Sequence, residues 1–300
     1  MLNIMKYYKF WFLVSGLLLV AGIVSLVSFK LKPGIDFTGG ALTQIQFNKA
    51  APQASEIQTV LSASGFTGAQ IQPAGNNEVI IRTGPQEQAE HAKLMKALSD
   101  KFGPVIEQQF TSIGPVIGKE LRSQAFVQLI LVSLGIIFYI AYAFRKVSKP
   151  VSSWRFGIAA VVALLHDLLI VLGAFSILGH FKGIEVDSLF VTAMMTVLGF
   201  SVHDTIVVFD RIRENLRVRA GSSLSEIINN SINQTLVRSL NTSLTVIFVL
   251  LSLFLFGGES IHYFVLALLI GIVAGTYSSI FIASPILIVW HNWELRKRSA

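Results

Sequence analysis

Residues 188–209 read SLFVTAMMTVLGFSVHDTIVVF, an apolar block that carries a histidine and an aspartate near its end. About 20 apolar residues cross the hydrocarbon core of a bilayer, so the block is long enough to span a membrane. Asp204 is followed by four apolar residues and one threonine within the block, and therefore lies inside it. The sequence predicts a membrane helix with an ionisable group in its interior.

Further apolar blocks of similar length occur at about 10–29, 124–144, 156–178, 238–256 and 263–290. With 53% hydrophobic and 14% charged residues, the composition is that of an integral membrane protein, because soluble domains carry about 25% charged residues. We predict an α-helical integral membrane protein with six transmembrane helices, the first an uncleaved anchor. The absence of cysteine excludes disulfides, thiolate metal sites and cysteine nucleophiles.

The net charge of +7 comes from basic residues at the ends of the apolar blocks, a pattern of membrane orientation and not of nucleic-acid binding. These residues are Lys6, Lys9, Arg145, Lys146, Lys149, Arg155, Arg211, Arg213, Arg217, Arg219, Arg296, Lys297 and Arg298. The short loops of the opposite side contain only Lys182. The positive-inside rule therefore predicts that both termini and the loops 145–155 and 210–237 are cytoplasmic.

This orientation divides the chain into three regions. Residues 1–29 form the cytoplasmic N-terminus and first helix, residues 30–123 an extracytoplasmic domain, and residues 124–300 the remaining five helices. Within the extracytoplasmic domain, residues 41–113 predict the order βαββαβ, which is that of a small α/β ferredoxin-like fold. Its lone histidine, His91, is expected on a solvated helix face.

The cytoplasmic loop contains a capping box, Ser223-Leu-Ser-Glu226, followed by an amphipathic segment. Ile227, Ile228, Ile232 and Leu236 fall on one side of this segment. Because the segment carries little charge, we expect its apolar side to lie against the membrane surface, as a connector or as an element that moves with the fifth span.

Charged residues inside the spans are the candidates for function. Asp167 follows His166 at the middle of the third span, Asp204 follows His203 late in the fourth, and Arg238 stands at the cytoplasmic end of the fifth. A charge at the bilayer centre costs about 2.5–3.5 kcal/mol, so such residues face other helices or a cavity. The structural alternatives are a hydrogen-bonding role for Asp167 and an Arg238 side chain that reaches the interface.

Three kinds of chemistry use such residues. A proton relay needs a carboxylate that is alternately protonated and paired with a cation. An intramembrane aspartyl protease needs two carboxylates that share a proton, but the Gly-x-Gly-Asp context of that family is missing here. A metal site would need ligands at helical spacing, and no His-Glu-x-x-His motif occurs. We favour the proton relay and predict neither catalytic residues nor a resident metal.

Five motifs together resemble those of the SecD/SecF family of the bacterial Sec translocon, within the resistance-nodulation-division superfamily. They are Gly34-Ile-Asp-Phe-Thr-Gly-Gly40, Ile113-Gly-Pro-Val-Ile-Gly-Lys-Glu-Leu121, residues 198–215 (LGFSVHDTIVVFDRIREN), Arg238-Ser-Leu-Asn-Thr242 and Phe256-Gly-Gly258. The fourth-span motif and the single outside domain are similar to the SecF branch. The resemblance extends over nearly the whole chain.

The resemblance implies half of a resistance-nodulation-division-like bundle in the bacterial inner (cytoplasmic) membrane. This half would pair with SecD and associate with the SecYEG channel and with YajC. It would use the proton-motive force, with protons as coupling ion and no other cofactor, to complete preprotein translocation after the ATP-driven stage. Membrane lipids surround it, and no nucleic acid is expected as a partner.

The resemblance also assigns roles to residues. Asp204 matches the proton-carrying aspartate and Arg238 its partner on the next helix, while His203 stands where many members have asparagine and offers a second relay group. His166 and Asp167 form a second polar cluster, and Gly34, Asp36, Gly39 and Gly40 belong to a structural motif.

Alternatives remain from the sequence alone. They are a small-molecule or lipid exporter of the same superfamily, an intramembrane aspartyl protease, a pure scaffold, and sodium instead of protons as coupling ion. The pair Gly271 and Gly275 in the sixth span permits close helix approach, either within the chain or to a partner half.

Overall fold

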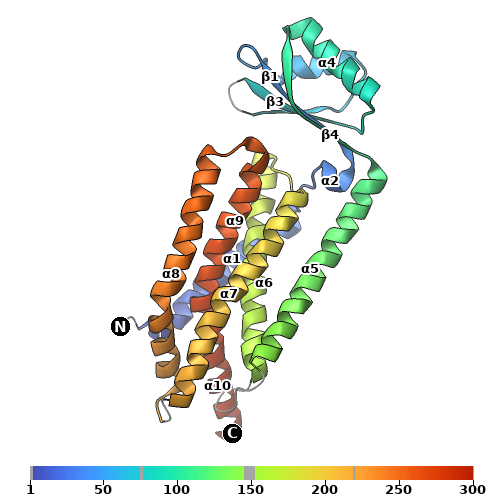
Figure 1. The fold of residues 1–300 in the computed structure, drawn as a ribbon. Helices are drawn as coiled ribbons and strands as arrows, with labels where there is room; N and C mark the ends of the chain where they lie inside the picture. The colour runs from blue at the N-terminus through green and yellow to red at the C-terminus, as the bar shows by residue number, and fades with distance from the viewer. Residues whose placement is uncertain (1–2, 75–76, 145–152, 219–220, 300) are drawn as a thin grey trace. The chain divides into compact units, whose positions relative to one another are not determined.

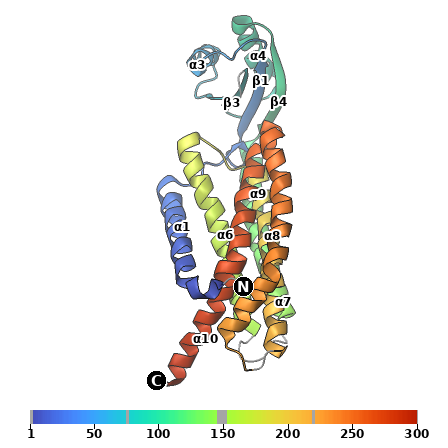
Figure 2. The ribbon, with the colours of Figure 1, turned by 90° about the vertical axis from the view of Figure 1, so that its left-hand side faces the viewer.

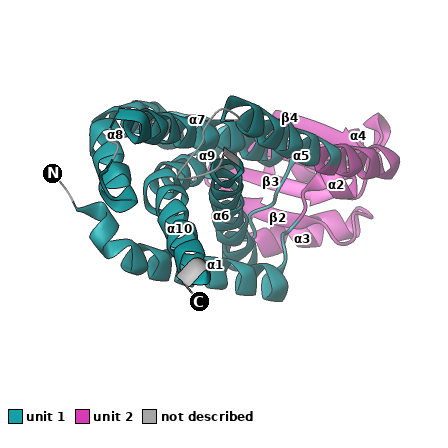
Figure 3. Ribbon diagram, turned by 90° about the horizontal axis from the view of Figure 1, so that it is seen from below, with its two compact units in different colours: residues 1–32, 127–300 teal, residues 33–126 magenta. Residues whose placement is uncertain are grey.

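The computed structural model describes residues 3–74, 77–144, 153–218 and 221–299. The basic residues Arg145, Lys146, Lys149 and Arg219 lie outside the described residues, as does Asn76 in the predicted turn of the outside domain. The chain divides into two compact units, residues 1–32 with 127–300 and residues 33–126, which Figure 3 distinguishes by colour.

The described residues contain six helices that are long and apolar enough to cross a membrane, which confirms the predicted fold class. They are α1 (Tyr8–Phe29), α5 (Pro115–Ala143), α6 (Ser153–Lys182), α7 (Ser188–Val218), α8 (Leu224–Phe256) and a sixth span built from α9 (Glu259–Ser278), a π-helical turn η2 (Ser279–Ala283) and α10 (Ser284–Ser299). A short 3₁₀ turn, η1 (Ile4–Tyr7), precedes α1.

The centre of the first unit is formed by α6, α7 and α9, which contact one another in pairs (Figure 1). Helix α1 packs against α6, and α8 packs against α7 and α9. Figure 2 shows that the start of α1 and the helix α10 lie at the same end of the bundle, as an even number of spans requires. The polar side chains considered below come from these central helices and from α8.

Helix α8 corrects one prediction. The amphipathic segment after Ser223 is not a separate connector, because α8 runs without interruption from Leu224 to Phe256. The capping box at its start is present as predicted. Ile228 and Ile232 are fully buried in an apolar cluster with Phe209 and Ile212 of α7. The expectation that this apolar side lies on the membrane surface is therefore wrong, since a helix of the same chain covers it.

The described part of the second unit contains a four-stranded sheet, two longer helices and a helix of a single turn. Its elements are α2 (Ile35–Thr38), β1 (Gly40–Phe47), α3 (Ala54–Ala63), β2 (Gln70–Pro73), β3 (Glu78–Thr83), α4 (Gln88–Phe102) and β4 (Val105–Ile113). The strand order is β2-β3-β1-β4, with all neighbours antiparallel. Apolar residues of β1, β3, α3 and α4 form its core. The predicted βαββαβ ferredoxin-like arrangement is confirmed.

His91 on α4 corrects a second prediction. The residue is only 6% exposed, its Nε2 atom lies 2.8 Å from Oε2 of Glu107, and its ring stacks on Phe110 at 3.7 Å between centroids. It was expected on a solvated face, but β4 supplies both partners and covers it. The helix pattern alone contains no information about this strand.

The motif from Gly34 to Gly40 forms the entry to the sheet. Gly34 precedes the single helical turn of α2, Asp36 lies in that turn, and Gly39 follows it with φ of 75°. A Cβ atom on Gly39 would lie 2.9 Å from Cα of Pro115, and one on Gly40, whose φ is 141°, would lie 2.9 Å from the carbonyl oxygen of Thr83. Both positions therefore require glycine.

Candidate functional site

Asp204 lies on α7 and faces α8. Its side chain is buried, with 2% of the residue exposed, and its Oδ2 atom has no hydrogen-bond partner among the described residues. The hydroxyl groups of Ser239 and Ser243 on α8 interact with it, one helical turn apart from each other. The Ser239 hydroxyl likewise has no hydrogen-bond partner within the described part of the chain. The carboxyl group thus occupies a polar but incompletely bonded site between two helices.

Arg238 and His203, the predicted partners of Asp204, are both exposed on the surface of the bundle. Both interact electrostatically with Asp204. Among the described residues, however, no ion pair with an N–O distance of 4.0 Å or less joins either of them to Asp204. The structure therefore places the three predicted relay residues around one point while Asp204 and Arg238 remain unpaired.

Asp167 forms a second and more completely bonded polar cluster. The residue is 1% exposed, and its Oδ2 atom accepts hydrogen bonds from Ser201 of α7 at 2.5 Å and from Ser278 of α9 at 2.7 Å. Its Oδ1 atom lies 2.9 Å from Nδ1 of His166. The predicted second polar cluster therefore brings together α6, α7 and α9.

The sixth span supplies polar residues that the sequence analysis missed. Thr276 bonds Ser243 at 2.6 Å, Ser278 bonds Asp167, and Ser279 lies 3.0 Å from the hydroxyl of Thr205. They belong to the run Thr276-Tyr-Ser-Ser279 inside an apolar block. Four consecutive hydroxyl residues were a usable signal, but a search restricted to charged residues passes over them.

Gly271 and Gly275 of α9 face α7 of the same chain. A Cβ atom on Gly271 would lie 2.2 Å from a methyl carbon of Val197, and one on Gly275 would lie 3.0 Å from Cβ of Ser201. Of the two uses considered for this pair, the structure has the internal one. The close approach of α7 and α9 is what allows Ser201 and Ser278 to reach the same carboxylate.

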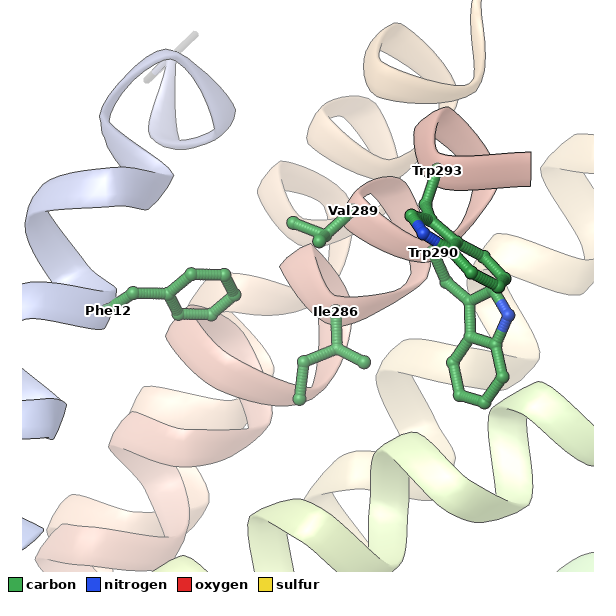
Figure 4. A pocket seen from close by; sticks show the side chains of 5 residues that line it. All are labelled: Phe12, Ile286, Val289, Trp290 and Trp293. Atoms are coloured by element: carbon green, nitrogen blue, oxygen red, sulfur yellow. The ribbon is translucent and has the colours of Figure 1, made fainter. Parts of the chain in front are cut away.

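Several cavities lie in the described part of the first unit, and one of about 480 Å³ lies beside Met5, Ser223 and His291. Two others lie along α1. One, of about 350 Å³, lies between α1 and α10 and is lined by the apolar and aromatic side chains shown in Figure 4: Phe12, Ile286, Val289, Trp290 and Trp293. The other, of about 550 Å³, is lined by His166 and Tyr277 together with apolar residues of α1, α6, α8 and α9. Of the cavities that these described residues line, the one of about 550 Å³ adjoins a polar cluster through His166.

A metal site receives no support from the geometry. Among the described residues, no group of three or more histidine, aspartate and glutamate side chains could hold a metal ion.

Comparison with known proteins identifies the family. Residues 93–293 match the family described as protein export membrane protein SecD/SecF, C-terminal, and residues 24–51 match the SecD/SecF GG motif. The chain belongs to the SecD/SecF family. The second match contains Gly39 and Gly40, whose steric requirement is described above, and the first contains both carboxylate clusters.

Relatives within the SecD/SecF family are similar over nearly their full length. The chain is 49% identical to the protein translocase subunit SecF of Thermobaculum terrenum, with 97% of this chain and 95% of that protein covered. It is 39% identical to the protein translocase subunit SecF of Anaerolinea thermophila, with 99% and 96% covered. These names are those of a translocase subunit, as predicted, and give no support to a protease or an exporter.

Solved structures of SecDF have the same fold. The crystal structure of SecDF, a translocon-associated membrane protein from Thermus thermophilus, superposes with a TM-score of 0.84 at 32% identity over 97% of this chain. SecDF in a super-membrane-facing form gives 0.71 at 30% identity over 99% of this chain. The chain corresponds to 39% and 40% of those longer chains.

Proposed function

We propose that this chain is the SecF-type half of a protein-export motor that works with a SecD-type half and uses the proton-motive force to complete preprotein translocation. Family membership and the match to about two fifths of SecDF support this assignment. The observation that carries the mechanism is the buried Asp204 carboxyl group, which has an unbonded oxygen and lies within electrostatic reach of an unpaired Arg238.

The proposed cycle follows from the cost of burying charge. A protonated Asp204 is neutral and is accommodated between α7 and α8 by hydroxyl groups. An ionised Asp204 needs a cation, and because Arg238 is exposed in this structure, pairing requires its side chain to turn toward α7, which a shift or rotation of α8 would bring about. Proton binding and release at Asp204 would therefore alternate two packings of α7 against α8.

The available energy is sufficient for such a change. Each elementary charge that moves through 100 mV of membrane potential supplies about 2.3 kcal/mol. A difference of about 1.4 kcal/mol changes a two-state ratio tenfold. The proton-motive force would thus shift the packing equilibrium. The change would act on a preprotein through α1 and α5, which precede and follow the outside domain in the chain.

The proposed setting is the inner (cytoplasmic) membrane, with both termini cytoplasmic, the SecYEG channel and YajC as further partners, and preproteins as the transported substrate. The basic residues at the helix ends support this orientation. Apart from Lys30, Lys32 and the basic residues of the extracytoplasmic domain, almost all of them lie in connections on one side of the membrane.

The test is preprotein export into membrane vesicles with and without an ionophore. Asp204→Asn should leave membrane insertion and recovery of the SecD-type partner intact but remove the ionophore-sensitive part of export. The matched control is Asp210→Asn on the same helix, because Asp210 is exposed and pairs with Arg213 at 2.5 Å. An Asp204→Asn protein that keeps its full ionophore-sensitive export would favour a pure scaffold.

A further inference from the structure

Asp167 is a buried carboxyl group that the proposed cycle does not use. Its three partners come from two other helices and from its own neighbour: Ser201 of α7, Ser278 of α9 and His166. The shortest of these bonds, from Ser201, is 2.5 Å long. Charge-assisted hydrogen bonds from a hydroxyl to a carboxylate typically measure 2.5–2.7 Å, and both serine bonds fall within this range as well as within that of ordinary O–H···O bonds.

One of the two ring nitrogens of His166 is not bonded to Asp167. Its Nδ1 atom faces Asp167, but its Nε2 atom is buried and has no hydrogen-bond partner among the described residues. The side chain is 3% exposed, and it lines the cavity of about 550 Å³. The ring of Tyr277 lies 6.1 Å from it between centroids, with 25° between the ring planes, and Tyr277 is the other polar residue in the cavity wall. A buried ring nitrogen that lacks a hydrogen-bond partner can bind a proton.

We propose that the His166–Asp167 pair is a second proton-binding site, which takes up and releases one proton through Nε2 of His166. This inference rests on the proposed function, because the proton-motive force would load the site. It names a site for the same coupling ion, on a different helix from Asp204.

The proton balance of the pair is simple. With Asp167 ionised and His166 protonated only on Nδ1, the pair has a charge of −1. A proton from the aqueous phase then forms a bond to Nε2, which gives an imidazolium–carboxylate pair without net charge. The Nδ1 proton then moves to Oδ1 of Asp167, which leaves a neutral imidazole beside a carboxylic acid and does not change that total. The neutral state is favoured at bilayer depth, because a net charge there is costly.

The protonation state of the pair affects its hydrogen bonds to α7 and to the sixth span. Ser201 and Ser278 donate to Oδ2, and a neutral acid accepts these bonds less strongly than a carboxylate does. Among the described residues, Tyr277 of the sixth span lines the same cavity as His166, whereas Asp204, three residues beyond Ser201 on α7, faces α8. Loading the pair would therefore loosen the contacts of α7 and of the sixth span with α6.

The experiment separates proton binding from a structural role by isosteric variants. Asp167→Asn can still accept from both serines and contact His166, but it cannot take up a proton. His166→Asn keeps an amide nitrogen near the position of Nδ1 and removes Nε2. Ser176→Ala is the control, because it removes another buried hydroxyl group from α6. All are tested in the full chain reconstituted with its SecD-type partner and normalised to the inserted amount.

Two readouts decide the outcome. Infrared difference spectra between acidic and alkaline pH should contain a carboxylic-acid band that Asp167→Asn removes and Asp204→Asn retains. Ionophore-sensitive export should fall about tenfold in Asp167→Asn and in His166→Asn, and should be unchanged in Ser176→Ala.

The inference is overturned if Asp167→Asn keeps full ionophore-sensitive export, or if no band is lost in its spectra. It is also overturned if a sodium gradient at constant pH drives export and Asp167→Asn abolishes that effect, since the cluster would then bind sodium. Failure of the proposed function has a different signature, which is full ionophore-sensitive export in Asp204→Asn with the Asp167 band still present.

Discussion

Ser201 donates a 2.5 Å hydrogen bond to Asp167 of α6 and lies three residues before Asp204 on α7. One helix therefore contacts one buried carboxyl group and carries the other. Thr205, on the following turn of α7, is bonded to Ser279 in the π-helical turn of the sixth span. A rotation of α7 that follows the charge of Asp204 would change the bonds of Asp167 as well.

The first prediction concerns Arg238. Arg238→Met removes the cation that an ionised Asp204 needs, so ionophore-sensitive export should fall about tenfold or more. Arg238→Lys retains the positive charge but has a shorter side chain with fewer hydrogen-bond donors, so it should keep part of that export. Equal export in Arg238→Met and in the unmodified chain, measured in the same vesicles, would remove Arg238 from the cycle.

A second prediction concerns the contact of α7 with α9. Gly271→Leu must displace Val197, whose methyl carbon would lie 2.2 Å from the new Cβ atom. Overpacking of this kind costs about 1–3 kcal/mol, so the thermal unfolding temperature in detergent should fall. Gly199→Leu on α7 is the control, because nothing lies within 4 Å of a Cβ atom there. Equal unfolding temperatures for the two variants would contradict the internal packing of this face.

The glycine pair of the outside domain gives a third prediction. Gly40→Ala combines an unfavourable φ of 141° with a Cβ atom 2.9 Å from the carbonyl oxygen of Thr83. The combined cost is about 1–3 kcal/mol or more, and it should appear as faster proteolysis of the domain. Gly84→Ala has neither problem and should digest at the rate of the unmodified chain. Similar rates for both variants would show that the strand pairing at Gly40 tolerates a side chain.

The fourth prediction concerns topology. Cysteines introduced singly at Ser55 and at Ser222, both exposed in a chain without cysteine, should react with an impermeant reagent from opposite faces of the membrane. Ser222 should label from the cytoplasmic face, because it follows the basic end of α7. Labelling of both residues from one face would contradict the proposed topology, and labelling of Ser222 only from the outer face would reverse the proposed orientation.

The sequence alone determined the elements. Six apolar blocks, the βαββαβ order of residues 41–113 and the capping box at Ser223 are all present in the structure. Each of these features depends on residues near one another along the chain, through hydrophobic length, periodicity and local hydrogen bonding. The sequence also indicated Asp167, Asp204 and Arg238 as candidates for function, because they lie within or beside apolar blocks. A charge in such a block is costly in a bilayer whichever helix the block packs against.

Only the tertiary structure decided which side chains meet. His91 is buried because β4 lies beneath it, and Ile228 is buried because α7 covers it. Ser201 and Ser278 are 77 residues apart in the chain, yet both donate to Asp167. A hydroxyl residue in an apolar block gives no local signal of its partner, since helix contacts are set by the packing of whole faces. The sequence predicted that Arg238 is the partner of Asp204. Whether the two side chains form an ion pair in this state depends on how α8 is rotated against α7, which is again set by the packing of whole helix faces.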